Sequence, residues 1–315
     1  MRRRSPAAAA AAAAALALVA LLASATCATA TLYSVNVPPR LQYQESNGYC
    51  GELAIQELML PYGVWIPQLA ARSAGGGELL PGVNYDKALD ALKIKYTTWA
   101  GTGGYKAFAA FAKKALMSTP RAGVVAVVYI KGLDDRQYDH ILPIVGVDTA
   151  SPPSSFVYQA SDVFSINTGF STAVVKRKAG DYSCTFRGKK NTVDEGGCVP
   201  SDTQWGFSIL GPKYAAATGP ATSLTVPRAS EPAPPGSPGA KFGATLKVTG
   251  LKAGTKYRVV KLTRVASVPA TAGPVTAAQV AGGEAVASFT ATGAEWSTAV
   301  TFMSNVPAWY FCVPA

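Results

Sequence analysis

The chain has 315 residues, of which 49% are hydrophobic and 15% are charged, and its formal net charge is +11. This length accommodates two domains, and this composition excludes an intrinsically disordered chain, which would be less hydrophobic and more charged. The basic residues are scattered and form no block interleaved with aromatic residues, so we expect no nucleic-acid partner. The positive charge does allow association with anionic surfaces.

Residues 1–30 have the pattern of a secretory signal peptide. Arg2, Arg3 and Arg4 form a positive start, a run of alanines and leucines follows, and Ala28–Ala30 is typical of a cleavage site. Cleavage removes three arginines and no acidic residue, so the mature chain stays basic. No later stretch is long and apolar enough to span a bilayer. We therefore expect a secreted monomer, outside the cell or in the endomembrane lumen, without stable membrane insertion after cleavage.

Helices are expected in the first half of the mature chain. Residues 31–43 are expected to be extended because two consecutive prolines exclude a helix there. The helical spacing of apolar residues after Cys50 predicts a helix that is ended by Pro61 and Gly63. The same spacing predicts three further helices over residues 66–73, 84–93 and 104–117.

Strands are expected from residue 124 onwards. The β-branched run Val124–Ile130 predicts the first of them. Further strands are predicted over residues 141–147, 155–160 and 204–210, with a hairpin-like region before the last. Helices followed by antiparallel strands indicate an α+β domain over residues 31–215.

A linker and a second domain are expected to follow. Residues 216–240 are rich in Ala, Thr, Ser, Gly and Pro, which is typical of a linker with polyproline character. Strands are predicted over residues 244–248, 256–262, 285–291 and 298–303, with glycine turns between them. The turn 250–257 resembles the one before a tyrosine-bearing strand in fibronectin type III-like domains. We therefore expect residues 241–315 to form a small all-β, sandwich-like accessory domain.

Cys50 and His140 are the candidate nucleophile and base. Cys50 opens a predicted helix, and the helix N-terminus and a nearby imidazolium would both lower the pKa of its thiol. His140 is the only histidine of the chain and stands just before the predicted strand 141–147. It would pair with the thiol and then protonate the leaving group. The alternative is a structural histidine.

Two further residues would complete this site. Gln44, six residues before Cys50, would donate to the oxyanion together with the Cys50 backbone amide. Asp162, at the end of the next predicted strand, would orient the imidazole, with Asn167 as the other candidate. The alternatives are a polar loop residue for Gln44 and a turn former for Asp162.

The cysteines leave two pairings open. Cys27 departs with the signal peptide, and Cys184 and Cys198 flank a polar loop that a disulfide would close. Cys50 and Cys312 are then either both free or bonded to each other, and a bond would exclude a catalytic thiol. One histidine and no close cysteine pair cannot provide a usual zinc site, and the acidic residues lack EF-hand spacing. We expect no metal and no cofactor.

The segments around these residues resemble the papain-like cysteine peptidases, in particular the C39-like peptidase branch. Cys50-Gly51 followed by a helix is similar to that family's nucleophile motif, and residues 139–148 are similar to its histidine strand. The resemblance covers residues 38–212. It implies a papain-like fold, and Gln44, Cys50, His140 and Asp162 fall in order on the family's oxyanion glutamine, nucleophile, base and orienting acid.

The sequence thus predicts a secreted cysteine peptidase with a Cys-His-Asp catalytic triad and a peptide or protein substrate. The reaction would pass through a thioester acyl-enzyme. Transglutaminase and amidase chemistry use the same groups, so these reactions stay open. The alternative from a different class is a catalytically silent secreted binding or surface protein that retains the papain-like fold.

Overall fold

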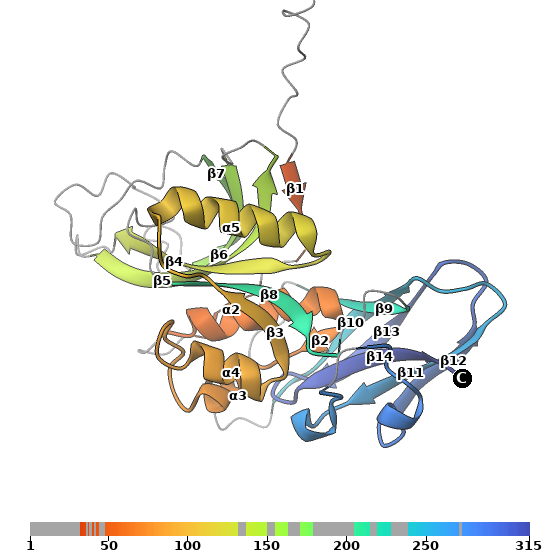
Figure 1. Cartoon of the computed structure of the whole chain (residues 1–315). Helices are drawn as coiled ribbons and strands as arrows, with labels where there is room; N and C mark the ends of the chain where they lie inside the picture. The colour runs from red at the N-terminus through yellow and green to blue at the C-terminus, as the bar shows by residue number, and fades with distance from the viewer. Residues whose placement is uncertain are drawn as a thin grey trace, which may run out of the picture. The chain divides into compact units, whose positions relative to one another are not determined.

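The described part of the chain is α+β, with its helices near the N-terminus and antiparallel sheets beyond them (Figure 1). The computed structural model describes residues 32–35, 37, 40, 42–43, 48–131, 137–149, 155–162, 171–178, 205–214, 219–227, 239–270 and 273–315. The predicted signal peptide (1–30), Gln44, Asn167, Cys27, Cys184 and Cys198 lie outside the described residues.

The four predicted helices are present. They are α2 (Cys50–Met59), α3 (Gln68–Gly75), α4 (Tyr85–Ala91) and α5 (Gly104–Ser118). All α2 residues after Cys50 are buried, so tertiary packing stabilises this short helix. It continues into a 3₁₀ turn, Leu60–Tyr62, and the chain then turns at Gly63, whose φ of 72° favours glycine. None of the described helices combines the length and hydropathy that a bilayer crossing requires.

The structure contains a seven-stranded antiparallel sheet. Five of its strands follow α5 in sequence, and two precede it. Its strands are β1 (Leu32–Ser34), β3 (Ile94–Thr98), β4 (Gly123–Lys131), β5 (Gln137–Asp148), β6 (Ser155–Asp162), β7 (Ser171–Lys178) and β8 (Gly206–Pro212). The order is β3-β8-β4-β5-β6-β7, and β1 pairs with β5. The sequence pattern did not predict β3, because only Ile94 of its five side chains is buried.

One prediction about this sheet is wrong in its boundary. β5 begins at Gln137, so His140 lies inside the strand and not just before it. The reason is the pairing with β4, which runs without interruption from Val124–Ile144 to Lys131–Gln137. The polar residues that precede Ile141 hide this extension from an apolar pattern.

Helices cover both faces of this sheet. Ile141 and Val145 of β5 belong to the hydrophobic cluster that contains α2. Leu142 and Ile144 belong to a second cluster, with Phe108 and other residues of α5. Figure 1 shows α2 and α5 on opposite sides of β4 and β5. The start of α2 therefore lies against one face of the strand that carries His140.

Two smaller antiparallel sheets contain most of the C-terminal residues. One has the order β13 (Glu295–Met303), β10 (Lys241–Thr249) and β9 (Ala221–Thr225). The other has the order β12 (Glu284–Thr290), β11 (Lys256–Leu262), β14 (Ala308–Pro314) and β2 (Val64–Trp65). Side chains from both sheets, among them Leu246, Val259 and Phe311, are buried in one cluster.

The prediction that residues 216–240 form a linker is wrong for part of this range. Residues 221–225 form β9 and pair with β10, so this part is a strand of the sheet. Thr222 and Leu224 are buried alternately, but the surrounding Ala, Thr and Pro residues hide this pattern in the sequence.

The C-terminal sheets are also not built from residues 241–315 alone. β2 follows α2 closely in sequence and pairs with β14, with Val64 opposite Trp309. The Trp65 ring packs 5.1 Å from those of Phe242 and Phe302, and its Nε1 donates to the Ser304 carbonyl at 3.2 Å. Contacts group Leu32–Ala315 into one compact unit. A buried tryptophan thus couples the helical region to the C-terminal sheets.

Candidate active site

Cys50 begins helix α2 at a point of close packing. A Cβ atom at Gly51 would lie 3.1 Å from the Leu79 carbonyl oxygen and from the Tyr85 ring, and 3.2 Å from Cδ1 of Ile141. The Tyr85 hydroxyl also donates to the Gly51 carbonyl at 3.0 Å. Glycine at this position therefore lets the start of α2 approach β5 and α4 closely.

The Cys50 thiol is free and partly buried. Cys312 is also free, so the alternative of a bond between them is not observed. The Ile141 backbone amide lies near enough to the Cys50 sulfur to lower the pKa of the thiol. Because Ile141 follows His140 directly, the predicted nucleophile lies beside the backbone next to the predicted base.

Burial dominates the electrostatics of the thiol. Burial raises the pKa of Cys50 to about 11, and the Glu52 carboxylate adds to this rise. The backbone amides of Ile141, Gly51 and Cys50 itself lower the pKa by a smaller amount. The backbone amides at the helix start do lower the pKa of this thiol, as expected, but desolvation outweighs them.

Arg72 of α3 contacts residues that precede Cys50 and a residue that follows it. The sequence did not predict these contacts. Its Nε lies 2.7 Å from Oε1 of the buried Glu52, and the Leu79 amide donates to the same oxygen at 3.3 Å. The Nη2 of Arg72 donates to the Gly48 carbonyl, and its Cζ lies 3.4 Å from the centre of the Tyr49 ring. One guanidinium thus contacts residues before and after the thiol.

Tyr43, the residue before Gln44, lies close to the residues that precede Cys50. The rings of Tyr43 and Tyr49 meet edge to face with 5.0 Å between their centres. The Tyr43 amide donates to Oε1 of Gln68 at 2.9 Å, and Nε2 of Gln68 donates to Oε1 of Gln56 at 3.3 Å. These contacts bring the chain just before Gln44 beside the residue that precedes Cys50.

His140 and Asp162 lie on neighbouring strands, of which the structure describes the backbone. His140 pairs with Val128 of β4. In the ladder between β5 and β6, Ile144 stands opposite Tyr158. The pairs of this ladder end there, four residues from His140 and four from Asp162. Asp162 is also the last residue of β6 and pairs with Ser171 of β7.

The chain matches no protein-family model, and no curated protein is significantly similar to it. Within the described ranges, no three His, Cys, Asp or Glu side chains gather where they could hold a metal ion.

Proposed function

We propose that the protein is a secreted cysteine-dependent hydrolase of papain-like fold, and most directly a peptidase. Cys50 is the nucleophile, His140 the base, Asp162 the residue that orients the imidazole, and Gln44 the second oxyanion donor. The observation that carries the proposal is that Cys50 begins a helix whose start packs against Ile141, on the strand of the only histidine.

The proposed reaction proceeds in two steps through a thioester. The Cys50 thiolate attacks the scissile carbonyl carbon, and the Cys50 amide and the Gln44 side chain stabilise the oxyanion. The C–N bond breaks as the His140 imidazolium protonates the leaving amine. Water then attacks the thioester while the imidazole takes its proton, and the carboxylic acid and the free thiol are released.

The side of β5 on which the His140 side chain lies is critical for the proposed reaction. The imidazole has to reach the side of the sheet that faces α2, where Ile141 and Val145 pack. Neighbouring residues of a regular strand face opposite sides. An active site therefore requires a local departure from this alternation at His140.

Cleavage of a general protein substrate tests the proposal. Fluorescently labelled, denatured casein is incubated with the purified protein under reducing conditions. We expect cleavage that is abolished by Cys50→Ala and reduced about 10²–10⁴-fold in kcat/KM by His140→Ala. Cys312→Ala is the matched control, because Cys312 is the other free cysteine of the described residues and should be dispensable. Cleavage that persists in Cys50→Ala would show that Cys50 is not the nucleophile.

A catalytically silent secreted binding protein is the second candidate. The observation that favours it is the Cys50 pKa of about 11, which leaves the thiol protonated at neutral pH unless another charge offsets burial. Absence of cleavage by the wild-type protein, together with an unreactive Cys50 thiol, would favour this candidate over the hydrolase.

A further inference from the structure

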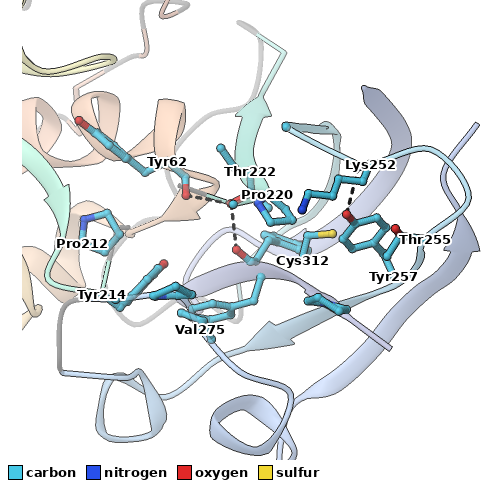
Figure 2. A pocket seen from close by; sticks show the side chains of 18 of the residues that line it. Tyr62, Pro212, Tyr214, Pro220, Thr222, Lys252, Thr255, Tyr257, Val275 and Cys312 are labelled. Atoms are coloured by element: carbon cyan, nitrogen blue, oxygen red, sulfur yellow. Dashed lines mark hydrogen bonds between the residues drawn. The ribbon is translucent and has the colours of Figure 1, made fainter. Parts of the chain in front are cut away.

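A cavity of about 620 Å³ lies at the other end of α2 from Cys50. Figure 2 shows residues that line it. Tyr62, which lines it, follows the C-terminal end of α2, whereas Cys50 begins that helix. Ten helical residues span about 15 Å, so the cavity is separate from the candidate active site. Its size is within the range of roughly 300–1,000 Å³ that is usual for small-molecule sites.

The wall of the cavity is mainly aromatic and apolar. Five aromatic side chains line it, namely Tyr62, Tyr214, Tyr257, Tyr310 and Phe311. Four prolines add apolar surface. Figure 2 shows that the wall combines the region after α2 with the C-terminal sheets, with Tyr62 opposite Tyr257 and Cys312. Such a wall suits the flat or bulky apolar body of a small molecule.

The charged groups on the wall are both cationic. Arg121 and Lys252 line the cavity, and its lining contains no aspartate or glutamate. Nη1 of Arg121 donates to the Pro61 carbonyl at 2.8 Å and to the Thr222 carbonyl at 3.0 Å. Within the described ranges, no acceptor contacts its Nε or Nη2, and no carboxylate pairs with it.

The local backbone and a neighbouring aromatic ring hold Arg121 in place. Its backbone adopts a φ of 68°, which is uncommon for a residue with a side chain, and its Cζ lies 4.8 Å from the centre of the Tyr62 ring. Burial lowers the pKa of this guanidinium, as expected for a cation that is partly removed from water without a counter-ion. An anion in the cavity would compensate this desolvation.

One hydroxyl group at the wall also lacks a partner. The Tyr214 hydroxyl is buried and forms no hydrogen bond within the part of the chain that the structure describes. A buried hydroxyl without a partner is destabilising. The wall thus combines a guanidinium that has no carboxylate partner with one unsatisfied phenol.

We propose that this cavity binds a small organic anion, a carboxylate with an aromatic or other apolar body, with its carboxylate on Arg121. Guanidinium and carboxylate form paired hydrogen bonds of favourable geometry, while the tyrosines and prolines contact the apolar body. This site is independent of Cys50 and its chemistry.

Calorimetric titration with a matched pair of probes tests the proposal. The probes are 4-phenylbutyrate and its neutral analogue 4-phenylbutyramide, which differ in charge and little in shape. We expect the wild-type protein to bind the carboxylate at least about tenfold more tightly than the amide. Arg121→Gln should remove this preference, and Arg121→Lys should keep part of it. Cys50→Ala should bind as the wild type does.

Val275→Trp is a second test that leaves Arg121 in place. Val275 lines the cavity and is half-buried, so a larger side chain should fill the space and weaken both probes. If Arg121→Gln does not fold, this variant and the comparison of the two probes decide the question. Equal affinity for the two probes, no saturable binding of either, or unchanged binding by Val275→Trp would overturn the proposal.

Discussion

The reactivity of Cys50 gives the sharpest test of the catalytic proposal. Burial by itself raises the pKa of this thiol to about 11, and His140→Ala should leave it near this value because the variant has no imidazole. At pH 7 a thiol of that pKa is ionised in about one molecule in ten thousand. An imidazolium that lowers the pKa to about 5 would make nearly all molecules thiolate at the same pH.

The rate of alkylation changes by less than the ionised fraction does. A less basic thiolate is a weaker nucleophile, with a Brønsted coefficient of about 0.4–0.5, so six pKa units cost roughly 500-fold in intrinsic reactivity. Ionisation still outweighs this loss. We expect wild-type Cys50 to react roughly 20-fold faster than Cys50 of His140→Ala at pH 7, and several hundredfold faster at pH 5.5.

The assay is alkylation by iodoacetamide between pH 5.5 and pH 8.5, with the Cys50 peptide quantified by mass spectrometry. In His140→Ala the rate should fall about tenfold for each pH unit, whereas in the wild type it should stay nearly flat. Cys312 is an internal control, because burial raises its pKa to about 12 and it should react slowly in both proteins. A tenfold fall per pH unit in the wild type as well would refute the ion pair.

Three other predictions concern stability. Arg72→Met should lower the free energy of unfolding by about 3 kcal/mol, because it leaves the buried Glu52 unpaired, and adding Glu52→Gln should restore part of this in urea titrations. A double variant no more stable than Arg72→Met would contradict this account. Trp65→Ala should cost about 3–5 kcal/mol in the same titrations and leave a single transition, because Trp65 packs with the C-terminal sheets; two separate transitions would argue against the shared core. Burial raises the pKa of Glu57 from 4.5 to about 8, so the folded state binds more protons than the unfolded one and stability should fall as the pH rises from about 4.5 to about 8. Glu57→Gln should lack this component of the pH dependence of the urea midpoint, and an unchanged profile would show that Glu57 titrates normally.

Several local features were predictable because they depend on short stretches of sequence. The apolar spacing after Cys50 predicted α2. Pro61 and Gly63 mark its end, because proline has no backbone amide to donate and glycine readily adopts the positive φ found at Gly63. The β-branched run from Val124 predicted β4 for a similar reason. The lone histidine and the cysteine at a helix start pointed to one region of the chain's fold, and Ile141, next to His140, does pack against Gly51, next to Cys50.

Other features depend on residues far apart in the chain. Arg72 contacts Glu52 twenty positions away, and no spacing rule connects them. Trp65 looks like part of a short connection, yet it fills the core of sheets formed near the C-terminus. Leu224 lies in a stretch of linker-like composition and is buried because β10 provides a strand to pair with.

By itself, the sequence determined the helices, most of the strands and the α+β class, and it named Cys50 and His140 as the candidates for thiol chemistry. The tertiary structure decided that β9 replaces part of a linker, that β2 joins the C-terminal sheets, and that Cys50 is held in a site whose burial raises its pKa. It also assembled the cavity around Arg121 from six separate parts of the chain. The physical reason is that dihedral preferences and apolar periodicity act over a few residues, whereas desolvation and side-chain pairing depend on which distant segments pack together.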